Sequence, residues 1–535
     1  MKTDTYRDNT LYTALLAAFC GIALLPVGAA YALAFGGPEG FTLAGFREVL
    51  AERRQWSLLV NTVLVAGSAS ALATVLGAPA GFVLARLTAR RPRMGGVLLG
   101  ILSAPFLMPH YILAVAWIEV LGTNGWVTRS LGWLGISGFP IYGRAGVILV
   151  YALTFYPLVM LAAVVGLRRF DGRLEEAARL SGSEARVFLG VTLPLLAPVL
   201  LSGTGFVFLF GLLSFSVPSL LQTPVYAVEI YTRFNSVNDP GGAILQSVPF
   251  LVFGVLAYGV WAGVLRPGYR RLGATPRPRT HLRPAGLGRA LGLAYVGGLA
   301  GVSVVLPLAV LVARSLPLSS FAQAWATARS EILTSLALAG LSATAGVTLA
   351  FAMTCVEKRR LSRVFLLSAL PFLVSGPVLG VGMIRLWNHH GVPGRVYDSF
   401  AIMVLACVAH GLVFAHYGLR AASRQLSPAC EEAAAVHGAG PWRRALGIRL
   451  PLLRPALIAI WGLLFVLAVG ELDAVLLVCP PGWTPLSVRL FTLMHYGPSS
   501  LVASLSLITL MLLFAGAALC VLAYAHARKW LDVRH

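Results

Sequence analysis

Long apolar runs separated by short polar segments dominate the pattern of this chain. Four of the clearest runs cover residues 11–36, 147–167, 290–312 and 501–523. Each is long enough to cross a lipid bilayer as a helix, which takes ~20 residues. About twelve runs of this kind follow one another along the chain. The pattern therefore predicts an all-α polytopic membrane protein with about 12 transmembrane helices.

The first run also has some features of a secretory signal peptide. Lys2 and Arg7 precede it, and Ala32 and Ala34 resemble a cleavage site. Its apolar stretch of about 25 residues nevertheless exceeds the roughly 7–15 residues of a signal-peptide core. We therefore interpret this run as a retained membrane span.

The composition agrees with a membrane protein, and the distribution of charge predicts its orientation. Of the 535 residues, 58% are hydrophobic and 12% are charged, whereas soluble domains are roughly 25% charged. The formal net charge is +22, but 31 of the 42 Lys and Arg residues fall on one side of the membrane if the N-terminus is cytoplasmic. Because such residues accumulate in cytoplasmic loops, we expect both termini in the cytoplasm. The excess of positive charge thus indicates a lipid bilayer and no nucleic-acid partner.

The chain also contains an internal repeat on either side of a linker rich in Pro and Arg. Residues 105–118 align with 371–384, and residues 61–67 align with 334–340. The sequence predicts a first half over 1–266, a cytoplasmic linker over 267–289 and a second half over 290–535, with six spans in each half. Repeats of this kind are common in transporters, where a pathway forms between the halves.

Two polar loops, at about 169–198 and 420–455, carry nearly the same sequence in equivalent places. EEAARLSGSEARVFLGVTLPLLAP begins at Glu175, and EEAAAVHGAGPWRRALGIRLPLLRP begins at Glu431. Glu and Ala favour a helix, and the small Ala side chains let another surface approach closely. The glycine that follows permits a turn, and the later proline suits the first turn of the next helix. A single segment of this type is usually an ordinary helical loop, but two copies favour a docking surface.

The order of these residues resembles the EAA loop of binding-protein-dependent ABC importer permeases. That motif reads EAA, three residues, Gly, nine residues, Ile, one residue, Leu-Pro. The second copy matches throughout, with Glu432, Ala433, Ala434, Gly438 and Pro451 at the motif positions. The first copy matches at Glu176, Ala177, Ala178, Gly182 and Pro194, but its Gly and Pro are 12 positions apart, where those of the second copy are 13 apart. The shortening affects the far end of the first loop and not its beginning.

The resemblance covers essentially the whole chain. The double length and the central linker are similar to the fused permeases of the ferric-iron class, as are residues 105–122 and 470–497. Permeases for thiamine, polyamines and phosphonate are built on similar lines. The resemblance implies a type I importer permease of the bacterial inner membrane, with ferric iron as the favoured substrate. It also implies that two copies of a cytoplasmic ATP-binding subunit grip the EAA loops and that a periplasmic binding protein delivers the substrate.

The chain shows no sign of catalysing ATP hydrolysis itself. A phosphate-binding P-loop needs a lysine after glycine, whereas Lys2, Lys358 and Lys529 follow Met, Glu and Arg. No two of the six cysteines have the spacing of a redox or metal motif. We therefore expect neither a catalytic residue, nor a cofactor, nor a metal site in this chain. For an iron transporter, the resemblance places high-affinity iron coordination in the binding protein.

Acidic residues inside an apolar run are the candidates for the translocation pathway. Glu471 and Asp473 interrupt the apolar segment LAVGELDAVLLV, and the same positions of the first half hold Ser214 and Ser216. Charged groups within the membrane are costly and therefore suggest a function. The alternative is that the acids lie near the periplasmic end of the span, partly solvated or paired with an arginine. For His110, His410 and His416, which also lie in apolar runs, polar contacts are favoured over metal ligation.

Two other classes of protein explain the sequence less well than an importer permease does. An ion-coupled secondary transporter also uses repeats and intramembrane acids, but it leaves the duplicated EAA loops unexplained. A membrane enzyme would need a nucleophile and base or an HExxH cluster, and the sequence offers neither. The sequence therefore favours an importer permease that is not an enzyme.

Overall fold

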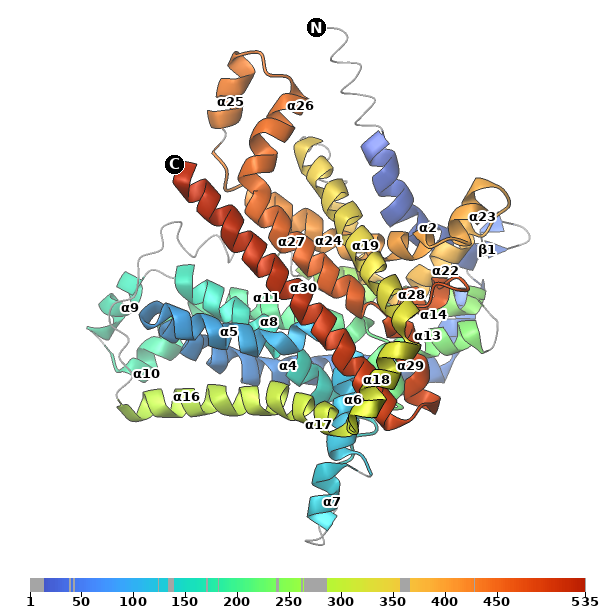
Figure 1. Cartoon of the computed structure of the whole chain (residues 1–535), viewed down its shortest axis with the longest axis horizontal. Coiled ribbons are helices and arrows are strands. Elements are labelled where there is room, and N and C mark those ends of the chain that lie inside the picture. The colour runs from blue at the N-terminus through green and yellow to red at the C-terminus, as the bar shows by residue number, and fades with distance from the viewer. Residues whose placement is uncertain are drawn as a thin grey trace. The chain divides into compact units, whose positions relative to one another are not determined.

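The chain is described here from a computed structural model (Figure 1). The described residues are 14–37, 40–41, 44–123, 125–132, 139–169, 172–180, 182–236, 240–260, 263, 286–356, 366–427 and 429–534. Apart from a hairpin of two short strands, β1 (Gly36–Gly37) and β2 (Gly40–Phe41), all regular structure in these residues is helical. The chain is therefore the all-α protein that the apolar runs predict.

The number of membrane-length helices agrees with the sequence prediction. Within the described residues, ten helices are long and apolar enough to span a membrane, and the number rises to twelve if each of two bent pairs counts as one span. The bends measure 93° and 111°, and they fall within the two aligned segments 105–118 and 371–384. The repeat seen in the sequence is thus also a repeat of an unusual helix break.

The structure divides into two compact units. One of them contains residues 48–232 and 248–314 and is called the first-loop unit, because it carries the loop that begins at Glu175. Its helices are α4 (Arg53–Arg90), α5 (Pro92–Leu107), α6 (His110–Leu121), α7 (Trp126–Gly132), α8 (Arg144–Arg169), α9 (Gly172–Arg179), α10 (Glu184–Val187), η2 (Phe188–Thr192), α11 (Leu193–Leu213), α12 (Ser216–Leu220), α16 (Gly286–Ala300), η4 (Gly301–Val305) and α17 (Leu306–Arg314). Helices α4, α8 and α11 pack against one another around buried Tyr151 and Tyr156. This packed group carries the first loop at the start of α11.

The second-loop unit contains residues 1–47, 233–247 and 315–535. Its helices are η1 (Cys20–Leu24), α2 (Leu25–Phe35), α18 (Leu318–Thr327), α19 (Arg329–Val356), η5 (Leu366–Ala369), α21 (Leu370–Leu373), α22 (Gly376–Trp387), α23 (Val392–Tyr397), α24 (Ala401–Ser423), α25 (Ala429–Val436), α26 (Pro441–Arg444), η6 (Ala445–Arg449), α27 (Leu450–Gly470), α28 (Val475–Val478), α29 (Leu486–Tyr496) and α30 (Ser499–Arg534). Helices α19, α24 and α27 pack together, and α30 packs on α27. Three further helices contain a boundary between the units, namely α3 (Ala44–Ala51), α13 (Tyr226–Asn235) and α14 (Pro240–Val260).

The first span of each sequence half lies in the compact unit that carries the loop of the other half. Helix α2 belongs to the first half but packs on α22, where a Cβ atom on Gly382 would collide with the Pro26 carbonyl. Conversely, α16 belongs to the second half but packs on α4, and the Tyr295 hydroxyl donates a hydrogen bond of 2.7 Å to the Leu76 carbonyl. The units therefore cut across the predicted halves, which describe the repeat in the sequence.

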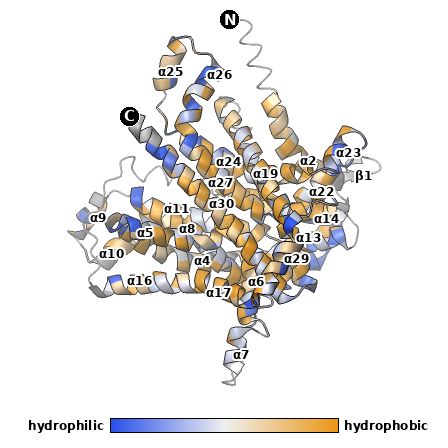
Figure 2. Cartoon of the chain, in the orientation of Figure 1, coloured by the Kyte–Doolittle hydropathy of each residue, from blue (hydrophilic) through white to orange (hydrophobic). Residues whose placement is uncertain are grey.

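The predicted linker falls largely outside the described residues. Only its last part, 286–289, is described, and there the chain already forms the start of α16. Figure 2 shows that the long helices of each unit are mostly hydrophobic and that short segments such as α26 contain hydrophilic residues.

Candidate functional site

The E-A-A segments form short helices that present the same residues to the outside. In α9, Glu176 and Ala177 are exposed, and in α25, Glu432 and Ala433 are exposed. The second alanines, Ala178 and Ala434, are half-buried in both copies. The helices expected from the Glu and Ala composition are thus present, and their exposed faces match.

An apolar side chain stands exposed at one shared position of the two loops. Leu180 follows Glu176 by four positions and is 91% exposed, and Val436 follows Glu432 by four positions and is 85% exposed. In α25 one helical turn brings Val436 onto the face of Glu432, and Leu180 directly follows the end of α9. Trp442 of α26 and Leu446 add exposed fractions of 55% and 54% to the second loop. Large apolar side chains gathered on a polar loop are typical of a surface that another protein covers.

The glycines of the two loops differ in conformation. Gly438 has a positive φ of 76° and ends α25. Its N–H bonds the Ala435 carbonyl at 3.0 Å, and the Ala439 N–H bonds the Ala434 carbonyl at 2.9 Å. This pair of bonds is the Schellman motif, whose left-handed position favours glycine. Gly182 has no positive φ, and a Cβ atom there would make an ordinary 3.4 Å contact with Arg186.

Both loops return to the membrane through a π-helix followed by Leu-Pro. Phe188–Thr192 and Ala445–Arg449 are π-helices that begin 257 positions apart, as do α11 and α27 after them. The E-A-A glutamates Glu176 and Glu432 are only 256 positions apart. The missing residue of the first loop therefore falls between its E-A-A helix and its π-helix. The far end of the first loop keeps the form of the second loop, which is a finding that the shortened spacing did not indicate.

The last residue of each π-helix holds the first glutamate of its own loop. Thr192 donates a hydrogen bond of 2.6 Å to Glu175, whose exposed fraction is 6%. At the equivalent place, Arg449 binds both carboxylate oxygens of Glu431 through its Nε and Nη2 atoms, the latter at 2.7 Å. The hydrogen bond from Arg449 lowers the pKa of Glu431. A hydrogen bond from a hydroxyl thus joins the π-helix to the E-A-A helix in the first loop, and an ion pair joins them in the second loop.

Arg449 also reaches the end of a membrane helix. Its Nη1 atom lies 3.3 Å from the Thr354 carbonyl and 3.3 Å from the Cys355 carbonyl, both in the last turn of α19. Carbonyl groups at a helix C-terminus lack partners within the helix and attract a cation. Arg449 therefore fastens the E-A-A helix α25 to α19. Sequence reasoning missed this contact, although Arg449 occupies the free position of the motif between Ile448 and Leu450.

The candidate pathway residues lie where a long helix breaks in each repeat. Ser214 ends α11 and Ser216 begins α12, and both side chains are buried. Glu471 ends α27, and Asp473 lies just before α28 and is 9% exposed. The break is therefore the same in the two repeats, while its side chains are hydroxyls in one unit and carboxylates in the other.

Glu471 connects several helices of the second-loop unit. Its Oε2 atom lies 3.1 Å from Nδ1 of His410 in α24, and its Oε1 atom accepts a hydrogen bond of 3.0 Å from the Ala474 N–H. Its backbone carbonyl accepts a 2.8 Å bond from the Ser487 hydroxyl of α29. His410 is therefore one polar partner of Glu471, and it was not among the partners that the sequence suggested. The sequence contains this signal in the intramembrane position of His410.

Asp473 lies beside the second helix break of the same unit. A Cβ atom on Gly376, at the start of α22, would come within 2.5 Å of the Asp473 Cβ atom and 2.8 Å of the Ala474 nitrogen. The two interrupted segments, α21–α22 and α27–α28, therefore pack backbone to backbone at Gly376. Non-helical backbone at membrane depth is tolerated where it is buried in protein or lines a cavity.

The remaining intramembrane histidines make separate polar or ring contacts. His416 Nδ1 lies 3.1 Å from the Ser368 hydroxyl, and His110 packs beside the ring of Phe155. Among the described residues, no group of three or more His, Cys, Asp or Glu side chains is placed to hold a metal ion. His410 and His416 thus face different partners, in agreement with their spacing of six positions.

Comparison with known proteins assigns the chain to a family. The model of the binding-protein-dependent transport system inner membrane component matches residues 77–271 and 342–530. Because these two matches cover more than half of the chain, the chain belongs to this family. It is a double permease subunit of a binding-protein-dependent ABC importer, and it is not the catalytic subunit.

Relatives that match most of the chain are named as iron permeases. The ferric transport system permease protein FbpB of Actinobacillus pleuropneumoniae is 24% identical over 505 residues, which are 89% of this chain and 72% of the relative. The Fe(3+)-transport system permease protein FbpB 2 of Haemophilus influenzae is 23% identical, over 88% of this chain and 90% of its own length. The molybdenum transport system permease protein ModB of Escherichia coli is 33% identical over 193 residues, or 34% of this chain and 81% of ModB.

Proposed function

We propose that this permease imports ferric iron delivered by a periplasmic binding protein. The observation that carries the proposal is the length of the similarity, since the relatives that match nearly 90% of the chain are named for ferric transport. The double length of the chain and the resemblance of segments 105–122 and 470–497 to ferric-iron permeases support the same substrate. Iron is here a cargo that passes through the membrane, and the protein needs no resident cofactor.

We further propose that each EAA loop docks one copy of a cytoplasmic ATP-binding subunit. The matched exposed faces of α9 and α25 support this role, as do Leu180 and Val436 at one shared position. Two loops of the same form fit two copies of one subunit. The orientation with both termini in the cytoplasm places these loops on the side where ATP is available, and it rests on the distribution of Lys and Arg.

The residues at the helix breaks form the proposed pathway, with Glu471 and Asp473 from one repeat and Ser214 and Ser216 from the other. Broken helices at the repeats are the usual place of substrate sites in transporters. Closure of the ATP-binding subunits moves the loops, and each loop continues directly into α11 or α27, at whose far end a break lies. ATP biases the transport cycle only as far as it binds one state more tightly than the other.

Uptake measured with the complete transporter tests the substrate. The permease, its ATP-binding subunit and its binding protein are expressed together in a bacterial host that lacks its own ferric-iron import. We expect ATP-dependent uptake of ⁵⁵Fe(III), which is lost when the ATP-binding subunit cannot hydrolyse ATP. Absence of iron uptake from a complex that assembles normally would overturn the iron assignment and leave the family membership intact.

Molybdate is the second candidate, because the molybdenum permease ModB is 33% identical to part of the chain. That similarity covers about one third of the chain, which is less than a single repeat. The same cells are therefore given ⁹⁹Mo-molybdate in a parallel experiment. Uptake of molybdate without uptake of iron would favour an oxyanion importer.

A further inference from the structure

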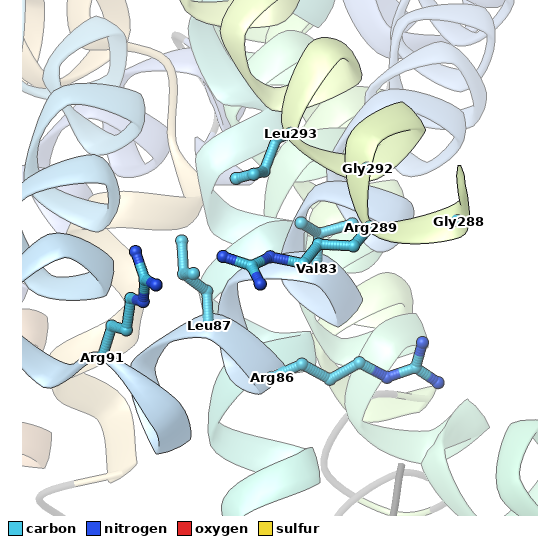
Figure 3. A pocket seen from close by; sticks show the side chains of 8 residues that line it. All are labelled: Val83, Arg86, Leu87, Arg91, Gly288, Arg289, Gly292 and Leu293. Atoms are coloured by element: carbon cyan, nitrogen blue, oxygen red, sulfur yellow. The ribbon is translucent and has the colours of Figure 1, made fainter. Parts of the chain in front are cut away.

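A cavity lined by arginines lies within the first-loop unit. Its volume is about 100 Å³, and it lies between the last turns of α4 and the first turns of α16. The residues that define its chemistry are Arg86, Leu87, Arg91, Arg289, Gly292 and Leu293 (Figure 3). The cavity thus lies between the end of one membrane-length helix and the start of another.

Two of the arginines approach the same space. The guanidinium group of Arg289 points toward the Arg91 side of the cavity, and Leu87 lies between them, whereas Arg86 points away (Figure 3). Among the eight described residues that line the cavity, none is acidic. Positive charges placed together without a carboxylate favour the binding of an anion. Guanidinium groups match the oxygen atoms of a phosphate especially well.

The rest of the lining is apolar. Leu87 is 9% exposed, and Val83 and Leu293, which also line the cavity, are half-buried. Gly292 brings α16 close to α4, because a Cβ atom there would lie 3.2 Å from a Val83 methyl group. A ligand that fits this lining has a negatively charged head and an apolar tail.

The position along the spans identifies the source of such a ligand. The candidate span of α4 ends at Ala89, and the candidate span that includes α16 begins at Gly288. The arginines therefore lie where the hydrocarbon of a bilayer gives way to the headgroups. Basic pockets between membrane helices at this level, on the cytoplasmic side, are the known form of anionic-lipid sites.

We propose that this cavity binds an anionic phospholipid, with Arg91 and Arg289 bonding the phosphate and an acyl chain along Leu87 and Leu293. The assignment to the inner leaflet rests on the cytoplasmic orientation proposed above. The lipid would strengthen the seam between α4 and α16, which is the place where a span of the second sequence half joins the first-loop unit. A ligand that binds only the folded state stabilises it.

The test uses the purified transporter complex and measures bound lipid by native mass spectrometry. The probes are phosphatidylglycerol, phosphatidylcholine and inorganic phosphate. We expect the complex to retain phosphatidylglycerol in preference to phosphatidylcholine and inorganic phosphate not to displace it. The double variant R91Q/R289Q should lose affinity for phosphatidylglycerol by roughly tenfold or more, since each basic residue contributes separately. R91K/R289K should retain most of the affinity, because the charge is kept.

R93Q/R528Q is the matched control, since it removes two exposed arginines from the same expected side of the membrane. Equal retention of phosphatidylglycerol by R91Q/R289Q and by this control would overturn the proposal. Equal retention of phosphatidylcholine would show an apolar crevice only, and displacement by millimolar phosphate would show a site for the free anion. Labelling of Arg93→Cys from one side of the membrane shows on which side residue 93 lies. A wrong assignment of the membrane orientation is thereby distinguished from a wrong assignment of the lipid site.

Discussion

Arg449 links the carboxylate of Glu431 to the last turn of α19, so one side chain joins an E-A-A helix to a membrane helix. In the first loop the same position is Thr192, which donates a hydrogen bond to Glu175. The two loops therefore have the same backbone plan but different connections to the spans. From the Arg449 contact to α19 we expect movement of the second loop to be transmitted to the membrane more rigidly than movement of the first.

Substitution of Arg449 should consequently harm coupling more than substitution of Thr192. Arg449→Gln removes the ion pair and the contacts to α19, whereas Thr192→Val removes one hydrogen bond. We expect Arg449→Gln to lower the substrate transported per ATP hydrolysed severalfold, with a smaller change for Thr192→Val. The measurement compares uptake and ATP hydrolysis in vesicles that contain equal amounts of complex. Identical ratios for the two variants would contradict a coupling role for Arg449.

The ion pair also predicts a dependence on pH. The hydrogen bond from Arg449 lowers the pKa of Glu431 below its ordinary value of 4.5. A lowered pKa means that the carboxylate stabilises the folded loop above the unfolded value and that this contribution is lost as the pH falls through the folded value. We expect amide exchange in α25, corrected for its intrinsic pH dependence, to stay slow from about pH 7 to pH 5 and to rise below about pH 4. In Glu431→Gln, amide exchange in α25 should already be faster at neutral pH and should show no further rise below about pH 4.

The two motif glycines should differ in their tolerance of side chains. Gly438 has a positive φ, so a β-branched residue there is strained by about 1–2 kcal/mol. Gly182 has an ordinary φ and open surroundings. We expect Gly438→Val to reduce the amount of ATP-binding subunit that copurifies with the permease and to uncouple ATP hydrolysis, with a weaker effect of Gly182→Val. Normal membrane levels of both variants serve as the control, and negligible effects at both positions would argue against docking by these loops.

The repeat, the membrane-length helices and the short E-A-A helices follow from the sequence because each depends on local pattern. Apolar length predicts a span, and the order of Glu, Ala and Gly predicts a helix that ends in a turn. The contact between Arg449 and α19 does not follow, since it joins residues about 95 positions apart. The exchange of α2 and α16 between the units was also hidden, because apolar spans pack on any apolar neighbour of suitable shape. The contact between Glu471 and His410 was missed for a similar reason, since a carboxylate accepts a hydrogen bond from a histidine as well as from an arginine.

Glu471 provides the most direct test of the proposed pathway. Its two carboxylate oxygens bond to His410 and to the Ala474 N–H, which places the charge at the break between α27 and α28. Glu471→Gln keeps the shape of the side chain and one acceptor oxygen but removes the charge. If that charge attracts a cationic substrate or holds a gate through His410, uptake normalised to assembled complex should fall at least tenfold, corresponding to about 1.4 kcal/mol.

A purely structural role of Glu471 gives the opposite pattern, with less assembled complex and an unchanged rate for each complex that remains. Ser487→Ala is the matched control, because it removes the hydrogen bond to the Glu471 backbone carbonyl and leaves the carboxylate in place. His410→Gln separates the two pathway roles. A gate that depends on the His410 contact should respond to it as strongly as to Glu471→Gln, whereas direct attraction of substrate should survive it. An unchanged normalised rate in Glu471→Gln would remove this residue from the pathway.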